Sequence, residues 1–226
     1  MTLLPLKLLA LGYLLPSSIL LRQMTVQRSE QLPTAFEVAG TLTLTGEAAR
    51  KGASALGQSP QDPLVVPARL SFAQGKCTLV AVRDPAGGQR LLAANDRGAT
   101  APADASAPAW LVRLGCLPFL FRGEGGAASL EAVMRKAGAR FEDAALTLEN
   151  GELAYVLGAG EDGVGKTGLV VQKHGLQPLR VWEDEGGARV AVIFRAYRQV
   201  FRDGGFPTIL ELRAGGATLA SFVAKP

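Results

Sequence analysis

The residues with the sharpest chemical signature begin at Gly160 and end at Thr167, and they match the phosphate-binding P-loop pattern. In such a loop, backbone N–H groups bind phosphate at the start of a helix that begins at the lysine, here Lys166. Residues 168–175 contain β-branched side chains and end in a turn, which predicts a strand in place of that helix. We interpret the segment as a glycine-rich hairpin loop, and a P-loop nucleotide-binding enzyme is the remote alternative.

Other groups that could support catalysis are few. His174 is the single histidine and is predicted to lie in a turn, and no Cys-x-x-Cys motif or Asp-rich loop supplies metal ligands. The acidic residues 183–185 precede two glycines and favour a solvated hairpin tip over paired catalytic carboxylates. Four arginines predict a charged convex sheet face: Arg180, Arg195, Arg198 and Arg202. The sequence therefore predicts no catalytic residue, metal site or cofactor.

The N-terminal segment is apolar, with Lys7 as the one charged side chain among residues 1–15. Its stretch from 8 to 15 has the length of a signal-peptide core and is too short to span a bilayer alone. We predict that residues 1–18 are an export signal and that the protein is periplasmic or otherwise in the cell envelope. An uncleaved anchor over residues 3–21, or a buried first helix, is the alternative.

The chain has two cysteines, Cys77 on a predicted strand and Cys116 in an apolar, helix-like segment. In an oxidising compartment such a pair favours a disulfide, which would stabilise the fold by roughly 3 to 4 kcal/mol. Two buried free thiols are the alternative.

Composition indicates a folded protein with a substantial core. Of 226 residues, 48% are hydrophobic and 19% charged, which fits one domain over residues 19–226. The net charge is +4, but the basic residues are scattered and not interleaved with aromatic ones, so we expect no nucleic-acid partner. We expect a monomer.

The C-terminal third reads as short apolar segments separated by glycine-rich or charged turns. We predict strands at 153–157, 168–173, 178–183, 189–197, 207–212 and 218–223. The gaps between them are too short for the crossover that a parallel pair needs, so the sheet is predicted to be antiparallel. Asn150–Gly151 predicts a further hairpin between residues 146–148 and 153–157.

The N-terminal part supplies helices and more strands. We predict a helix from Ser17 or Ser18 to about Glu30, strands at 36–44, 66–72, 76–83 and 89–94, and an exposed loop at 95–109. A short helix is possible at 47–55. An apolar helix around residues 110–117 and an amphipathic helix capped by Ser129 and stopped by Gly138 follow. This order predicts an α+β fold with helices on one side of a sheet.

The arrangement resembles the LolA-like family of periplasmic lipoprotein carriers and lipid-binding proteins, from Leu20 onward over about nine-tenths of the chain. The resemblance lies in the helix before residues 36–46, the strand pair 168–173 with 177–180, and the motifs at 193–197 and 204–207 before a penultimate strand. It implies a strongly curved antiparallel sheet, an incomplete β-barrel, with two or three helices plugging its concave apolar face.

A curved sheet with one apolar face also predicts an apolar hollow that suits an acyl chain. We therefore expect a non-catalytic, exported carrier of lipid or lipoprotein acyl chains, with membrane-bound donor and acceptor proteins as possible partners. A structural or interaction protein of the envelope with a filled core is the alternative. The predicted concave wall consists of Phe36, Val38, Leu42, Leu44, Leu70 and Phe72, and the predicted lid of Trp110, Leu111, Leu114 and Leu117.

Overall fold

The computed structural model describes residues 15–82, 88–97, 105–123, 125–142, 144–160, 165–201 and 204–225. Most of the predicted export signal lies outside these residues. Its last two residues, Ser17 and Ser18, form the first turn of helix α1 (Ser17–Gln31), whose N-cap is Pro16.

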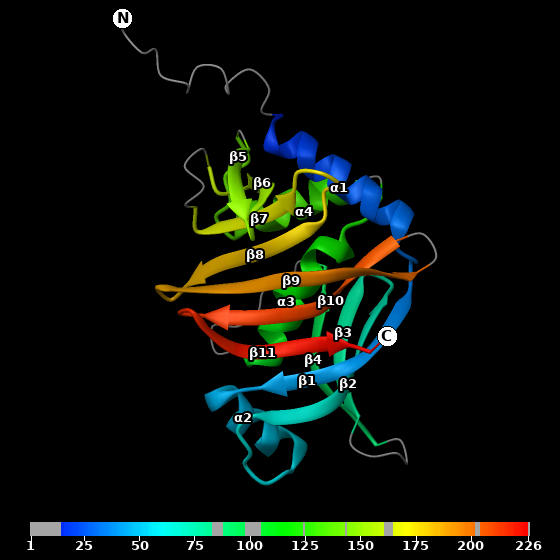
Figure 1. The fold of residues 1–226 in the computed structure, drawn as a ribbon, viewed down its shortest axis with the longest axis vertical. Coiled ribbons are helices and arrows are strands. Elements are labelled where there is room, and N and C mark those ends of the chain that lie inside the picture. The colour runs from blue at the N-terminus through cyan, green and yellow to red at the C-terminus, as the bar shows by residue number, and fades with distance from the viewer. Residues whose placement is uncertain are drawn as a thin grey trace, which may run out of the picture.

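One eleven-stranded sheet organises the molecule, in the order β4-β3-β2-β1-β11-β10-β9-β8-β7-β6-β5 (Figure 1). Every neighbouring pair is antiparallel. Its strands are β1 (Phe36–Leu44), β2 (Leu64–Ala73), β3 (Lys76–Val82), β4 (Gln89–Asp96), β5 (Ala145–Glu149), β6 (Glu152–Leu157), β7 (Thr167–Gln172), β8 (Pro178–Glu185), β9 (Ala188–Phe201), β10 (Gly204–Ala214) and β11 (Ala217–Ala224). The sheet is open because β4 and β5 are its two edges. The predicted α+β fold with an incomplete barrel is therefore confirmed.

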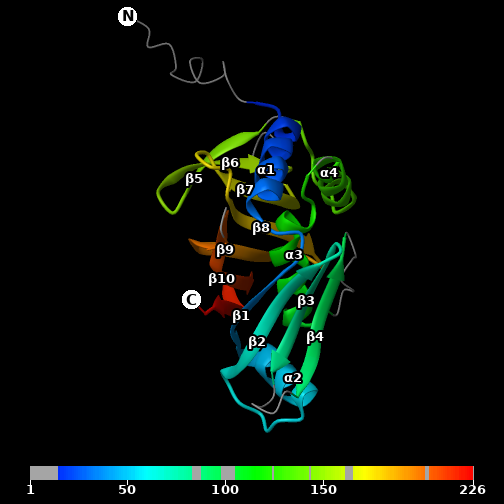
Figure 2. The ribbon, with the colours of Figure 1, turned by 90° about the vertical axis from the view of Figure 1, so that its right-hand side faces the viewer.

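Four helices in the described residues pack on the concave side of this sheet. Helix α3 (Ala107–Leu120) crosses the middle, while α1 and α4 (Gly126–Lys136) lie at the β5–β8 end and α2 (Gly46–Leu56) at the other end (Figures 1 and 2). Each helix contributes buried apolar residues to one continuous core cluster with the concave strand residues. The hydrophobic core thus lies between the sheet and its helices.

Alternation along the strands decides which residues enter this core. In β1, Val38, Leu42 and Leu44 are buried and the side chains between them face outward. Gly40 occupies the inward-facing position between Val38 and Leu42. Any side chain there would clash, because a Cβ would lie 2.6 Å from the Phe222 ring. The glycine therefore lets a β11 phenylalanine cross over β1.

All six predicted C-terminal strands are confirmed, as is the hairpin at Asn150 and Gly151. These two residues have φ angles of 54° and 84°, the positive values that a tight two-residue hairpin turn requires. The short helix expected at 47–55 is present as α2.

Two local expectations are wrong. The predicted loop at 95–109 overlaps β4, which runs to Asp96 and buries Asn95 by pairing with β3; residues 98–104 of it lie outside the described residues. Ser129 does not cap α4, because the helix begins three residues earlier, at Gly126. Its N-cap is Gly125, which has a φ of 80°, a conformation that glycine adopts readily because it has no Cβ.

Candidate functional site

The P-loop match does not have the structure that phosphate binding needs. Thr167 is the first residue of β7, and its hydroxyl donates a hydrogen bond to the Ala137 carbonyl at 2.6 Å. A strand therefore follows Lys166 where a P-loop would start a helix. Residues 161–164 of the match lie outside the described residues.

Glu183 does not belong to a solvated tip, so the prediction for the acidic segment at 183–185 is wrong for this residue. Its carboxylate accepts two hydrogen bonds from Arg113 of α3, at 2.5 and 3.2 Å, and both side chains are largely buried. Glu183 shares the inward face of β8 with Val181, and this placement brings it under the helix. The pair fixes α3 to β8 and offers no second carboxylate for acid–base catalysis.

The predicted charged convex face is present at Arg180 and Arg195. Arg180 pairs with Glu149 at 3.1 Å and stacks on the Trp182 ring, and Arg195 lies 3.5 Å from Glu211. Arg198 is exposed, His174 lies exposed in a turn, and Arg202 falls outside the described residues. The described members of this set are solvated or paired on the outside of the sheet.

The structure brings the ten predicted lipid-binding residues together on the concave side. Nine of them are buried and Phe36 is partly buried against the same cluster. Thirteen of the fourteen residues of α3 are also buried, so this helix occupies the space between the arms of the sheet. Contact of these ten residues with lipid stays a prediction.

An aromatic cluster, which sequence reasoning identified only in part, lies between α3 and the sheet. It contains Phe36, Phe72, Phe119, Phe194, Phe201 and Phe206, whose neighbouring ring centroids are 4.4 to 6.3 Å apart. Only the first two were predicted. Phe194 could have been added from the sequence, because Val190, Val192 and Phe194 alternate along β9 on one face.

The predicted disulfide is confirmed, and it joins α3 to the sheet. Cys77 of β3 and Cys116 of α3 are bonded, with their Cα atoms 6.3 Å apart and a separation of 39 positions in sequence. The helix on the concave face is therefore covalently tethered at one point and paired by charge at another.

Sequence reasoning also missed a buried arginine on α1. Arg28 is fully buried, and its Nη1 donates to the Gly205 carbonyl at 3.2 Å. Burial lowers the pKa of the Arg28 guanidinium, and burial raises the pKa of the nearby Tyr197 phenol. The Tyr197 hydroxyl donates to the Pro178 carbonyl at 2.5 Å.

A second arginine closes the same end of the molecule. Arg122, just after α3, donates hydrogen bonds to the carbonyls of Leu32 and Pro33 after α1. Burial, and then the charge of Arg97, lower the pKa of Arg122. The ends of α1 and α3 are thus joined through backbone acceptors.

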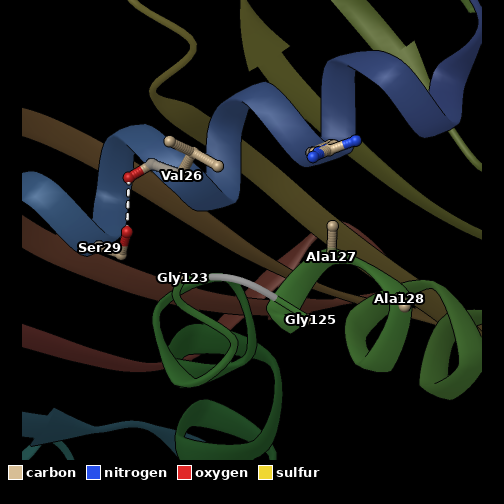
Figure 3. A pocket seen from close by; sticks show the side chains of 7 residues that line it. Val26, Ser29, Gly123, Gly125, Ala127 and Ala128 are labelled. Carbon is tan, nitrogen blue, oxygen red and sulfur yellow. Dashed lines mark hydrogen bonds between the residues drawn. The ribbon is translucent and has the colours of Figure 1, made fainter.

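A surface groove of about 490 Å³ runs between α1 and the start of α4 (Figure 3). Arg22, Val26 and Ser29 line it from α1, and Gly123, Gly125, Ala127 and Ala128 line it from the facing side. The Ser29 hydroxyl is used within α1, where it donates to the Val26 carbonyl at 2.7 Å. None of the ten predicted lipid-binding residues lines this groove.

The described residues offer neither a metal site nor a membrane-spanning helix. No cluster of three or more histidine, cysteine, aspartate or glutamate side chains there has the spacing to hold a metal ion. Within the same part of the chain, no helix has the length and apolar character to cross a membrane.

Comparisons with known proteins bear on the fold. No family model and no curated protein matches the chain. A solved domain from Vibrio parahaemolyticus, described provisionally as an outer membrane lipoprotein-sorting protein domain, is 12% identical with a TM-score of 0.53; the match covers 92% of this chain and 90% of that one. A LolA superfamily protein from Nitrosomonas europaea is 13% identical with a TM-score of 0.47, over 94% and 92% of the two chains. The chain has the LolA-like fold that its sequence predicts, an open antiparallel barrel with helices on its concave face.

Proposed function

We propose that this protein is an exported, non-catalytic carrier that holds acyl chains of lipids or lipoproteins against the concave face of its sheet. The observation that supports the proposal is that the apolar helix α3 lies over the concave face. A continuous apolar surface spans the open sheet, and a single apolar helix, α3, lies over its middle. Displacing one element would therefore expose a surface suited to an acyl chain.

The energies of displacement and binding are of similar size. Sixteen buried methylenes contribute about 13 kcal/mol at roughly 0.8 kcal/mol each. Helix α3 buries seven large apolar side chains, namely Trp110, Leu111, Val112, Leu114, Leu117, Phe119 and Leu120, and exposing each costs about 1.5 to 3 kcal/mol, which is roughly 10 to 20 kcal/mol for the helix. The balance suits a ligand that is bound and later released.

Export and partners form the other part of the proposal. The disulfide supports an oxidising compartment, because such bonds persist outside the cytosol. An apolar acyl chain leaves a membrane reluctantly, so a carrier of this kind would receive and deliver its cargo at membrane-bound donor and acceptor proteins. We propose that the protein acts as a monomer.

Native mass spectrometry of protein purified from its own host tests the proposal. The expected result is a set of masses above that of the bare chain, which organic extraction removes and identifies as acyl lipids. A second exported protein from the same host, purified in the same way, controls for lipid carried over nonspecifically. A bare mass in both proteins would contradict the carrier function.

A second candidate is an interaction protein of the envelope with the same fold and a permanently filled core. The tether between Cys77 and Cys116 and the ion pair between Arg113 and Glu183 favour it, because both hold α3 in place. In this case the protein would keep a bare mass, and α3 would exchange its amide hydrogens as slowly as the central strands do.

A further inference from the structure

Arg28 is a buried cation with unused hydrogen-bond donors. Its side chain has no exposed surface, and Nη1 makes the bond to Gly205. Among the described residues, the Nε and Nη2 atoms have no hydrogen-bond partner. One turn along the same helix, the Gln31 Oε1 atom is also buried and has no partner in the described part of the chain.

This arrangement is costly unless a partner completes it. An arginine keeps its charge in a protein, and a buried charge without a counter-charge destabilises the fold. Burial lowers the pKa of Arg28 because the charged guanidinium loses its hydration inside the protein. No ion pair among the described residues includes Arg28.

The unused atoms define the chemistry of the missing partner. Nε and Nη2 form one edge of the planar guanidinium, and two parallel N–H groups on such an edge match the two oxygens of a phosphate or carboxylate. The bond from Nη1 to Gly205 fixes the plane of the group. Gln31 Oε1 adds an acceptor that matches a hydroxyl on the same partner.

The position of Arg28 adds an apolar neighbour. Gly205 precedes Phe206, which belongs to the aromatic cluster with Phe201, Phe36 and Phe72. Helix α1 ends beside the start of β10, where Arg28 contacts Gly205 (Figure 1). An anionic group at Arg28 would therefore lie at the end of the apolar concave face.

We propose that Arg28, assisted by Gln31, binds the anionic head group of an amphiphile whose acyl chain lies among these phenylalanines. This inference rests on the proposed carrier function for the acyl part, and on Arg28 for the head group. A free phosphate offers the same oxygens, so the test must separate a head group from a free anion. Binding requires α1 and the start of β10 at Gly205 to separate around Arg28.

The test measures binding of three probes to the full chain: dodecyl phosphate, dodecanol and inorganic phosphate. The first two share one tail and differ in the head. We expect the wild type to bind dodecyl phosphate at least tenfold more tightly than dodecanol. Arg28→Met should remove that preference and leave dodecanol binding unchanged. Arg22→Met changes an exposed arginine on the same helix and should keep the preference.

Each outcome decides the matter. Equal affinities of the wild type for dodecyl phosphate and dodecanol would overturn the head-group site while leaving the carrier function standing. Binding of neither dodecyl compound would overturn the carrier function as well. Inorganic phosphate bound as tightly as dodecyl phosphate would show a free-anion site. If Arg28→Met does not fold, Arg28→Lys retains the charge without the two-pronged edge and should lose most of the preference.

Discussion

Reduction of the bond between Cys77 and Cys116 is expected to destabilise the protein and to loosen α3 on the sheet. The bond closes a loop of 39 residues, for which the chain-entropy model gives about 4 kcal/mol of the free energy of unfolding. Both cysteines are fully buried, and reduction removes no heavy atom from the core. The loss therefore measures the constraint rather than the packing.

Urea unfolding of oxidised and reduced wild type, followed by tryptophan fluorescence and extrapolated linearly, gives the difference. The double variant Cys77→Ala, Cys116→Ala should lose the same amount and about 1 kcal/mol more for the removed atoms. A difference below about 1 kcal/mol between oxidised and reduced wild type would refute this estimate.

The same two samples test whether α3 is the cover that ligands displace. We expect a fluorescent fatty acid to enter the reduced protein faster than the oxidised one, because reduction frees one attachment of the helix. If stability falls as expected but the uptake rate is unchanged, α3 does not control access to the concave face.

Three further predictions concern packing and charge. Arg113→Met leaves Glu183 buried without its partner and should cost about 3 to 5 kcal/mol in urea unfolding, and adding Glu183→Leu should recover most of that loss. Gly40→Ala places a Cβ 2.5 Å from a β11 carbonyl oxygen, so the thermal midpoint should fall by an amount equivalent to about 1 to 3 kcal/mol; an unchanged midpoint would contradict the packing of β1 on β11. Because burial raises the pKa of Tyr197 above its ordinary 10.0, the stability it contributes is present below pH 10 and lost as the pH rises further, and Tyr197→Phe should flatten this decline in urea midpoints.

The strands could be predicted because their information is local. Alternating side chains fix which face of β1 is buried, and the Asn150–Gly151 pair fixes a hairpin, whatever the rest of the chain does. The P-loop match could be rejected for the same reason, since the residues after Lys166 already favour a strand.

The buried charges could not be predicted because their partners are distant in sequence. Arg28 stands among polar residues and looks solvated until a hairpin 177 residues later contacts it. Glu183 lies in an acidic run before two glycines, and only Arg113, 70 residues earlier, makes its burial favourable. How closely α3 would fill the concave face is also a tertiary property, since an apolar helix can be either a core element or a lid.

Tryptophan quenching by a brominated fatty acid shows on which face of the sheet an acyl chain binds, because the two tryptophans of the chain report on opposite faces. Trp110 of α3 lies in the concave core, and Trp182 lies in the small cluster on the convex face. In the variant Trp182→Phe, the remaining Trp110 should be quenched in a saturable manner. In Trp110→Phe, the remaining Trp182 should keep its emission. Quenching of Trp182 with Trp110 unaffected, or of neither, would contradict acyl binding on the concave face.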